Sequence, residues 1–483
     1  MNFKTKEHQS IFLMFILTTF FLIFQHKTAQ SWDFSVYVLN AKYLFSNGTY
    51  FELYRAPLAS GLLGLLFIFG KLSEYIYLII TSTLFLIANL KLSNSIFKKY
   101  PKKELAQLIF YFFSLSIFVL VYATSVGTEL LGLAFFELFL AALINKKVSG
   151  HYLGLAILTR YNFLIFFPFL FFNKNYKKII KNTFLTFIII LPWGIFNFIR
   201  YNNWFASIID SYALNVYLRD YIFQSFNFLI IAKLTTWFLP LTIIGLTLSI
   251  LQIIKTKNLK SKSLSIIFIL ISILIIFDCY QIPLKIERYL FNLSLPIAFF
   301  SSIGFLYLYN KIKIPKKIII FALVIIFLLI ISTLTFGAYQ RRHYTDKFYN
   351  AAQDIKKLDL TSCEILSPHW VPVTYYTENV YALGSNSIQS SIYNNKIILI
   401  FKGETTIDDL FKTSEIESTN KIYETEEYFL IGKVNLTKIN CAPKYVYNST
   451  IVNNHCEILS KRFTKIKLET ISYKTCELIN FNF

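Results

Sequence analysis

Long runs of hydrophobic residues, separated by short polar segments rich in lysine, make up the first two thirds of the chain. Runs such as Leu264–Phe277 and Ile318–Phe336 contain no charged residue, and a helix of about 20 apolar residues crosses the hydrocarbon core of a bilayer. The pattern therefore predicts membrane-spanning helices. The nine runs that we expect to cross are Ile11–Phe24, Tyr75–Phe97, Leu105–Ala123, Thr128–Ile144, Ile179–Phe198, Leu229–Ile254, Leu264–Phe277, Tyr289–Tyr309 and Ile318–Phe336.

The lysines between these runs predict the direction of each crossing, because cytoplasmic loops of membrane proteins carry an excess of Lys and Arg. Placing all lysine clusters inside puts residues 25–74 outside as a first outer loop, and puts the end of the last span outside as well. An apolar stretch in that loop, Leu58–Phe69, is short for a crossing, so we expect an amphipathic helix along the interface. The clusters are Lys98–Lys103, Lys146–Lys147, Lys174–Lys178, Lys255–Lys262 and Lys311–Lys317.

The segment His151–Phe172 lies between two of these clusters, so both of its ends face the same side. It is too long for a loop and short for two full crossings. We expect a broken or re-entrant helix pair with the break at Thr159-Arg160, a geometry that is tolerated where protein or water surrounds the backbone. Counting this pair, the chain is predicted to be a polytopic α-helical membrane protein with about 11 transmembrane helices.

The composition changes near Gly337, where charge rises and long apolar runs stop. We therefore divide the chain into a transmembrane domain, residues 1–337, and an extracytoplasmic α/β domain, residues 338–483, in which short strands alternate with helices. The tail after Cys441 also reads as strand-rich. The expected strands are Cys363–Leu366, Val371–Tyr376, Lys396–Phe401 and Tyr428–Val434, and the expected helices are Asp346–Leu358 and Thr406–Phe411.

Four of the five cysteines fall in this second domain. On an outer face they allow two disulfides in three possible pairings, or they are free buried thiols. A zinc site is less expected, because no C-x-x-C spacing occurs. The cysteines are Cys363, Cys441, Cys456 and Cys476, and sequons at Asn47, Asn435 and Asn448 are either glycosylation sites or chance matches in an asparagine-rich chain.

The net charge of the chain does not alter the prediction of a membrane protein. A net charge of +21 in a soluble protein would suggest a nucleic-acid partner. Here 55% of the residues are hydrophobic and only 16% are charged, and the lysines sit in short loops between spans, as the positive-inside rule describes. We therefore expect a multi-pass protein of the cell membrane, in contact with membrane lipids and with no nucleic-acid partner.

Charged residues near membrane depth are costly, so each of those on the outer side is a candidate for function. Asp33 follows the first span, and Arg55-Ala56-Pro57 follows it in the same loop, which suits a carboxylate and a phosphate-binding cation facing one cleft. A helix N-cap is the ordinary alternative for Asp33. The candidates are Asp33, Glu52, Arg55, Glu129, Arg160, Arg200, Asp210, Arg219, Asp220, Asp278, Lys285, Glu287 and Arg288.

Structural roles compete with function at the other positions. Glu129 begins a predicted helix, where an acid suits the positive end of the helix dipole. Arg160, at the predicted break, is explained either by function or by pairing with an acid. Lys285 and Tyr289 sit where a span begins and are typical interfacial anchors, and Arg288 either pairs with a carboxylate or binds phosphate.

Taken in order, these motifs resemble the GT-C superfamily of polyprenyl-phosphate-dependent glycosyltransferases, in particular the protein O-mannosyltransferase and lipid A aminoarabinose transferase group. The resemblance covers Asp33–Tyr309. The sequence departs from the family pattern at Phe34, where an acid is common, at Glu129, where Asp is common, and at Ala56, where Pro is common. The matching elements are Asp33, Arg55-Ala56-Pro57, Glu129, Gly150–Arg160, Pro192-Trp193 with Asn197, Arg288-Tyr289 and Leu295-Pro296.

The resemblance implies transfer of a sugar from a polyprenyl (dolichyl-type) phosphate carrier to an acceptor hydroxyl on the outer face, with inversion. Asp33 is then the expected base, and Arg55 and Arg288 stabilise the departing phosphate. Arg160 and Lys285 are the next candidates for this role, and Tyr289 completes the predicted donor-phosphate site. Glu129 orients the acceptor, positions an arginine or helps to hold a divalent metal; no metal-ligand set is expected with certainty.

Two other functions compete with this one. A transporter or lipid flippase with an outer partner-binding domain would show internal repeats and ionisable groups near the midplane, whereas here the charges gather on the outer side. An adhesin-like protein would need one span for its anchor. The enzyme hypothesis requires Asp33, Arg55 and Arg288 to line one cavity, and it leaves the acceptor open among protein, lipid and glycan.

Overall fold

The computed structural model describes residues 5–29, 31–123, 127–172, 175–217, 224–227, 229–255, 259–312, 314–383, 394–403, 421–432 and 441–449. Several expectations concern positions outside these ranges. They are the candidates Arg219 and Asp220, the helix Thr406–Phe411, the cysteines Cys456 and Cys476, the sequon at Asn435 and most of the tail after Cys441.

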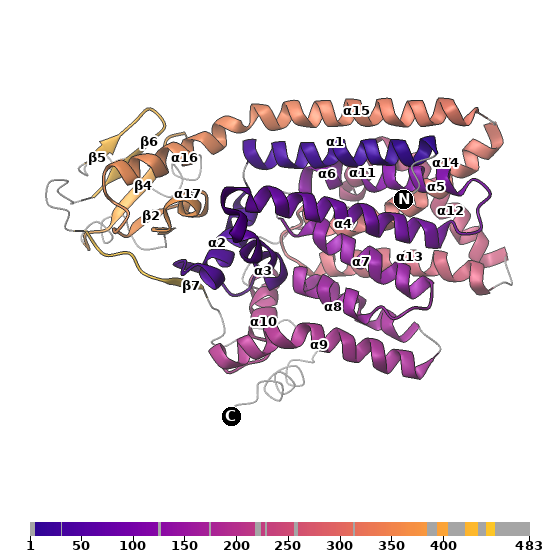
Figure 1. Cartoon of the computed structure of the whole chain (residues 1–483), viewed down its shortest axis with the longest axis horizontal. Helices are drawn as coiled ribbons and strands as arrows, with labels where there is room; N and C mark the ends of the chain where they lie inside the picture. The colour runs from indigo at the N-terminus through magenta and orange to yellow at the C-terminus, as the bar shows by residue number, and fades with distance from the viewer. Residues whose placement is uncertain are drawn as a thin grey trace.

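A bundle of long helices forms most of the molecule, and the short strands gather at one end of it (Figure 1). In chain order the elements are α1 (Lys6–Thr28), α2 (Trp32–Phe45), β1 (Tyr50–Glu52), α3 (Pro57–Leu66), η1 (Phe67–Leu72), α4 (Ser73–Ile96), α5 (Lys103–Ser114), α6 (Ile117–Tyr122), α7 (Glu129–Ile144), α8 (Gly150–Thr159), η2 (Tyr161–Phe172), α9 (Tyr176–Tyr201), α10 (Ala206–Tyr212), η3 (Ala213–Tyr217), α11 (Leu229–Thr235), η5 (Thr236–Phe238), α12 (Leu239–Lys255), α13 (Leu259–Gln281), η6 (Glu287–Leu293), α14 (Ser294–Ile312), α15 (Lys316–Gln340), α16 (Arg342–Lys357), β2 (Ile365–Ser367), α17 (Trp370–Thr377), β3 (Val380–Ala382), β4 (Ile397–Phe401), β5 (Lys421–Glu424), β6 (Tyr428–Ile431) and β7 (Tyr447–Ser449).

Seven helical segments of the described chain are long and apolar enough to cross a membrane, which confirms a multi-pass membrane protein. Two predicted spans appear as shorter pieces. The run Leu105–Ala123 is divided into α5 and α6, and Thr128–Ile144 is the 16-residue helix α7. The seven segments are Lys6–Thr28, Pro57–Ile96, Tyr176–Tyr201, Leu229–Lys255, Ser263–Tyr280, Glu287–Ile312 and Lys316–Lys357.

The predicted break at Thr159-Arg160 is confirmed. Helix α8 ends at Thr159, Arg160 has an extended backbone (φ −154°, ψ 123°), and the 3₁₀-helix η2 follows. Helices α8 and α9 run parallel, because Gly150 contacts Asn182 while Gly154 contacts Thr186 further along both helices. Since both helices begin at the same end of the bundle, η2 carries the chain back between them, as a re-entrant pair requires.

The predicted interfacial helix is a separate element. Pro57 occupies the first turn of α3, where a missing N–H costs no helical hydrogen bond. The chain then bends at Gly70, whose backbone (φ 56°, ψ −127°) interrupts the helical path before α4. Between them Ile68 is 84% exposed, as expected for an apolar residue that faces lipid.

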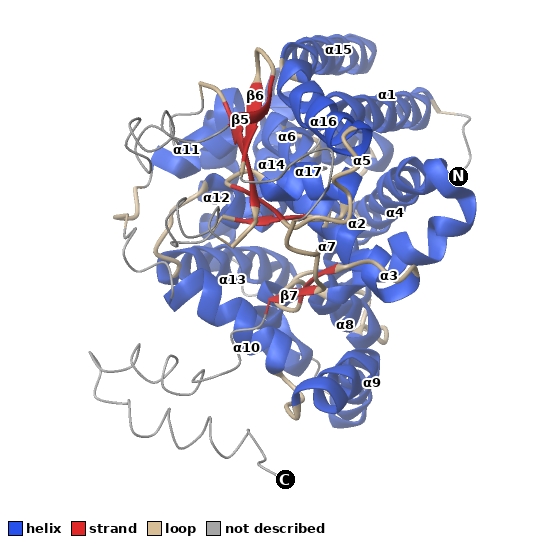
Figure 2. Ribbon diagram, turned by 90° about the vertical axis from the view of Figure 1, so that its left-hand side faces the viewer, coloured by secondary structure: helices blue, strands red, loops and turns tan. Residues whose placement is uncertain are grey.

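The C-terminal region contains a five-stranded mixed sheet in the order β3-β2-β4-β6-β5. Strands β2, β3 and β4 are parallel, whereas β6 is antiparallel to β4 and β5. The expected strands at Lys396–Phe401 and Tyr428–Val434 are present as β4 and β6. Figure 2 shows these strands in front of the helix bundle, with β7 set apart from them.

The expectation of a strand at Val371–Tyr376 is wrong, because this segment is helix α17. Its Pro372 falls within the first turn, where no intrahelical N–H is needed. Val371 and Thr374, one helical turn apart, are buried. Helix α17 packs against α2, so tertiary packing overrides the β-propensity of the Val and Tyr residues.

The first outer loop and the C-terminal region meet. Strand β1 pairs in parallel with β7, with Tyr50 opposite Tyr447, and their rings stack 4.7 Å apart. Within the C-terminal region Cys363 and Cys441 form a disulfide across 78 residues of sequence. Both regions therefore lie on the same side of the bundle.

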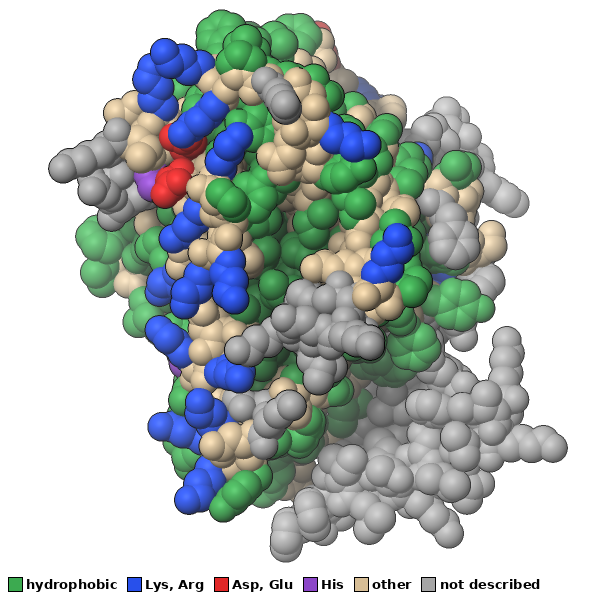
Figure 3. All heavy atoms as spheres, turned by 90° about the vertical axis from the view of Figure 1, so that its right-hand side faces the viewer, with side chains coloured by type: hydrophobic (Ala, Val, Ile, Leu, Met, Phe, Trp, Pro, Cys, Tyr) green, Lys and Arg blue, Asp and Glu red, His purple; other side chains and the backbone are tan. Residues whose placement is uncertain are grey.

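Lysines gather at the opposite end of the molecule (Figure 3). This end contains the turns between α4 and α5, between α7 and α8 and between α14 and α15. The bundle is thus basic at one end and carries its sheets at the other. The exposed lysines of these turns include Lys98, Lys99, Lys102, Lys146, Lys147, Lys311, Lys316 and Lys317.

Candidate active site

Asp33 lies in the first turn of α2 and is not its N-cap. Ser31 occupies the cap position, and its hydroxyl accepts a hydrogen bond from the backbone N–H of Phe34 (3.2 Å). The carboxylate of Asp33 is therefore available for other partners. The N-cap alternative for this residue is wrong.

Two arginines from distant segments hold the Asp33 carboxylate. Nη1 of Arg55, which precedes α3, lies 2.6 Å from Oδ1 of Asp33, and Nη1 of Arg288, in η6, donates to Oδ2. Burial raises the pKa of the Asp33 carboxyl, but the positive charges of Arg55 and Arg288 outweigh burial and lower this pKa to about 2. The Asp33 carboxylate is thus ionised at neutral pH.

Arg55 bridges two acids. Its Nε donates to Oε2 of Glu52 (2.9 Å), so the guanidinium lies between Asp33 and Glu52. Burial disfavours the charged form of Arg55, yet the two carboxylates outweigh this and raise its pKa well above the ordinary value. Sequence reasoning named Glu52 as a candidate but gave it no role; its position three residues before Arg55 was the available signal.

Glu129 and Arg160 form a second ion pair. Glu129 is the first residue of α7 and is fully buried. It binds the guanidinium of Arg160 and accepts from the Thr128 hydroxyl (3.2 Å). The structural alternative for Arg160, pairing with an acid, is therefore present, and Glu129 positions that arginine.

These groups surround one cavity of about 430 Å³. Asp33, Arg55 and Arg288 all line it, as the enzyme hypothesis requires, and Arg160 and Tyr289 line it too. Glu129 does not reach the wall and stays behind Arg160. Another part of the wall is apolar, contributed by Leu164, Ile165, Ile208, Leu214, Phe277 and Ile282.

Lys285 lies elsewhere. Its ammonium donates to the carbonyl oxygens of Cys279 (3.2 Å), Tyr280 (2.8 Å) and Ile282, at and just beyond the end of α13. Carbonyls at a helix C-terminus lack some of their intrahelical partners, and a lysine is a common way to satisfy them. Lys285 is not among the cavity-lining residues, so the geometry gives no support to a phosphate-binding role.

A cluster of hydrogen bonds that the sequence did not predict contacts the cavity wall through Tyr161. The Ser207 hydroxyl lies 2.9 Å from the Tyr161 hydroxyl, 2.8 Å from Nε1 of Trp193 and 2.9 Å from Nδ2 of Asn197. Trp193 and Asn197 belong to the Pro-Trp…Asn element noted in the sequence. Tyr161 lines the cavity, so this element acts on the site through Ser207 and Tyr161.

Among the described residues, no group of three or more His, Cys, Asp and Glu side chains is arranged to hold a metal ion. Two acids line the cavity, Asp33 and Asp278, and Asp33 is paired with Arg55 and Arg288. Glu129, which does not line it, is paired with Arg160. The arrangement thus offers an ionised carboxylate and three guanidinium groups next to an apolar wall. It suits an anionic ligand that also carries a hydrocarbon chain.

Comparison with known proteins identifies the fold. No protein-family model and no curated protein matches the sequence. Among solved structures, ArnT from Cupriavidus metallidurans bound to undecaprenyl phosphate matches with a TM-score of 0.59 over 88% of this chain and 97% of that chain. This chain has the ArnT fold. The sequence identity is 9%, and ArnT in the apo state gives a TM-score of 0.56.

The oligosaccharyltransferase of Archaeoglobus fulgidus in the apo form also matches, with a TM-score of 0.49, 11% identity and 83% and 70% of the two chains covered. The match to ArnT is the one that bears on the fold, and it confirms the GT-C-like architecture expected from Asp33–Tyr309. It extends into the C-terminal region as well, since 88% of the chain is covered.

Proposed function

We propose that this protein is a membrane glycosyltransferase that moves a sugar from a polyprenyl-phosphate carrier to an acceptor hydroxyl. The observation that carries the proposal is the ionised Asp33, held between Arg55 and Arg288 on the wall of a cavity that is partly apolar. The fold adds support, because ArnT has been crystallised with undecaprenyl phosphate. A polyprenyl-linked sugar phosphate has the polar and apolar parts that this cavity matches.

The arginines of the cluster suit such a donor. Asp33, Glu52 and Glu129 offset the positive charges of three arginines, which are Arg55, Arg160 and Arg288. These six side chains sum to zero, and Asp278 also lines the cavity, so direct contacts with the guanidinium groups, rather than a net positive charge, would bind a sugar phosphodiester. The phosphodiester competes with Asp33 for the guanidinium of Arg288, and loss of that contact makes the carboxylate more basic. Donor binding thereby prepares the base.

The reaction is a single displacement. The acceptor hydroxyl gives its proton to Asp33, and its oxygen forms a bond to the anomeric carbon of the sugar. The bond between that carbon and the phosphate oxygen breaks, and its electron pair goes to the phosphate. Asp33 becomes neutral at the moment when the departing polyprenyl phosphate gains negative charge, so Arg55 and Arg288 are released to stabilise it. The anomeric configuration is inverted.

The other residues have supporting roles in this proposal. Arg160, held by Glu129, adds a third cation to the wall, and Tyr289 lines the donor side. The cavity lies on the extracytoplasmic side, together with the C-terminal region of residues 338–483. Residues 1–337 form the transmembrane domain, with about 11 crossings when the shorter helices α5 to α8 and η2 are counted.

Asp33→Asn tests the proposal, since it removes the base and keeps the shape. Purified protein in liposomes is incubated with labelled polyprenyl-phosphate sugars and with protein, lipid and glycan acceptors, and transfer is measured. We expect the variant to lose about 10²–10⁴-fold in rate, the usual contribution of a general base. Asp354→Asn, an acid of the C-terminal region outside the cavity, is the matched control and should transfer normally.

Two results would overturn the proposal. Near wild-type transfer by Asp33→Asn would exclude Asp33 as the base. Failure of the wild-type protein to transfer any lipid-linked sugar, while it remains folded and monodisperse, would exclude the function itself.

A further inference from the structure

A chain of hydrogen bonds connects the C-terminal region to Asp33. Nε1 of Trp370, in α17, donates to the Tyr50 hydroxyl (3.0 Å). That hydroxyl donates to Oε1 of Glu52 (2.6 Å), and Oε2 of Glu52 accepts from Arg55 (2.9 Å). Arg55 in turn holds Asp33 at 2.6 Å. Trp370 and Tyr50 are 320 residues apart in sequence, so only the folded C-terminal region completes this chain.

Hydrogen bonds from its own backbone and from a neighbouring strand hold Glu52 in place. Its backbone N–H donates to Oδ1 of Asn40 (2.8 Å), and its carbonyl accepts from Nδ2 of the same side chain (2.9 Å). Strand pairing between β1 and β7 holds the segment from the other direction, with Glu52 opposite Ser449. Glu52 is only 3% exposed and does not line the cavity. It therefore acts on the site through Arg55.

We propose that Glu52 is a positioning residue, and that the C-terminal region orients the Arg55–Asp33 pair through Trp370, Tyr50 and Glu52. This inference rests on the proposed function. A guanidinium bound by Glu52 through Nε and by Asp33 through Nη1 has both its position and its plane fixed. Without Glu52, the Arg55 side chain can adopt more orientations. The Asp33 carboxylate that it holds then loses its alignment with the acceptor.

Single substitutions along the chain give the first test. Glu52→Gln removes the charge that holds Arg55, and Tyr50→Phe and Trp370→Phe each remove one hydrogen-bonding group while keeping the ring. We expect Glu52→Gln to lower kcat by about 10–100-fold, the range that corresponds to loss of one hydrogen bond between charged groups, and the two aromatic variants to lower it by about 5-fold each. The carrier KM should change by less than about 3-fold, because none of these residues lines the cavity.

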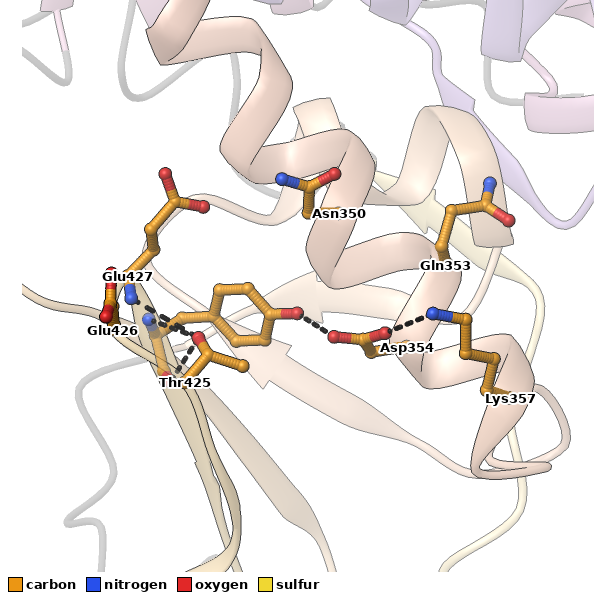
Figure 4. Close-up of a pocket in the computed structure, with 8 residues that line it drawn as sticks. Asn350, Gln353, Asp354, Lys357, Thr425, Glu426 and Glu427 are labelled. Atoms are coloured by element: carbon orange, nitrogen blue, oxygen red, sulfur yellow. Dashed lines mark hydrogen bonds and ion pairs between the residues drawn. The ribbon is translucent and has the colours of Figure 1, made fainter.

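A matched control comes from a second pocket, which lies in the C-terminal region between α16 and the β5–β6 turn (Figure 4). There the hydroxyl of Tyr428 donates to Asp354, which also pairs with Lys357 (3.0 Å). Tyr428→Phe removes the same kind of tyrosine–carboxylate contact as Tyr50→Phe, but in the described part of the chain this contact has no hydrogen-bonded connection to Arg55. We expect its kcat per folded molecule to equal that of the wild type.

A double-mutant cycle tests whether Trp370 acts through Tyr50. Once Tyr50→Phe has removed the acceptor hydroxyl, adding Trp370→Phe should change kcat by less than about 2-fold, whereas independent effects would multiply. Rates are normalised to folded protein by thermal unfolding of each variant. This separates a change in kcat from a loss of stability.

The failures of the two proposals are distinguishable. If the wild type transfers sugar and Glu52→Gln, Tyr50→Phe and Trp370→Phe behave like Tyr428→Phe, the positioning inference is overturned alone. Multiplicative effects of Tyr50→Phe and Trp370→Phe would likewise overturn the path through Tyr50. If the wild type transfers no sugar, the proposed function falls and the inference falls with it.

Discussion

Asp33 makes the stability of the site depend on pH. Its pKa lies at about 2 in the folded protein, below the ordinary value of 3.8. A lowered carboxyl pKa stabilises the folded state above the unfolded value, and this contribution is lost as pH falls from about 4 through about 2. The difference corresponds to about 2 kcal/mol. We therefore expect the gap in Tm between wild type and Asp33→Asn to be largest above about pH 5 and to shrink toward about pH 2.

Thermal unfolding of both proteins in detergent across this range measures the gap. Other carboxylates titrate in the same window, but they are shared by the two proteins and cancel in the difference. A gap that stays constant between neutral and strongly acidic pH would show that Asp33 gains nothing from Arg55 and Arg288.

Arg288 and Lys285 are three residues apart, and the family resemblance implies phosphate binding for both. The structure gives them different partners, since Arg288 binds Asp33 at the cavity and Lys285 binds carbonyls near the end of α13. Arg288→Ala should raise the carrier KM and lower kcat, together about 10–100-fold in kcat/KM, because a charge-assisted contact to phosphate is lost.

Lys285→Met is the matched comparison. It keeps the apolar stem and removes the ammonium, so we expect a lower Tm with a carrier KM unchanged within about 2-fold. Carrier kinetics and thermal unfolding of both variants decide between the roles. An equal rise in KM for the two variants would contradict the separation.

Individual residues also show which parts of the candidate site can be predicted from the sequence alone. Asp33, Arg55 and Arg288 were identified because they occur in a recognisable order within one chain. The role of Glu52 depends on Tyr50 and Trp370, whose contact spans 320 residues. The contacts of Ser207 likewise join α9, α10 and η2. Contacts that depend on packing between distant segments leave no local pattern to read.

At the scale of helices, α12 and α14 pack through glycine. A Cβ on Gly304 would lie 2.1 Å from the Leu241 carbonyl oxygen, and one on Gly245 would lie 1.8 Å from the Phe300 oxygen. The two backbones are therefore in direct contact, as small residues allow in membrane bundles. Because the obstacle is backbone, Gly304→Ala requires the helices to separate, and we expect it to destabilise the protein by about 1–3 kcal/mol.

Gly337 provides the control, because a Cβ there meets nothing within 4 Å. It lies inside helix α15, so Gly337→Ala should leave Tm unchanged or raise it slightly, given the higher helix propensity of Ala. Comparison of the two Tm values is the measurement. Equal Tm values for the two alanine variants would mean that α12 and α14 adjust freely.

Helix boundaries were predictable where charge or hydropathy marks them. The break at Arg160 followed from lysine clusters on both sides of one apolar segment, a constraint that acts across the whole bilayer. Helix α17 was mistaken for a strand because its Val and Tyr residues favour strands in isolation. Its contacts with α2 decide otherwise, and those contacts come from a segment more than 300 residues earlier.

On the scale of the whole molecule, the two ends of the bundle differ in chemistry. One end carries the exposed lysines of three turns (Figure 3). The other end carries the sheets, the disulfide Cys363–Cys441 and the cavity with Asp33. Disulfides persist mainly outside the cytosol, and lysine-rich loops remain in it. Both rules favour the same orientation, and we therefore propose that the sheets and the cavity lie outside the cytosol.

This orientation predicts which positions a membrane-impermeant thiol reagent reaches in intact cells. Lys444→Cys places a thiol on an exposed position of the C-terminal region, and Lys147→Cys places one on the turn between α7 and α8. We expect labelling of the first in intact cells and of the second only after permeabilisation, with the parent chain giving the background. Lysine-rich loops are costly to move across the membrane, so mixed orientations are not expected. Labelling of Lys147→Cys in intact cells would place the cavity in the cytosol, away from any acceptor outside the cell.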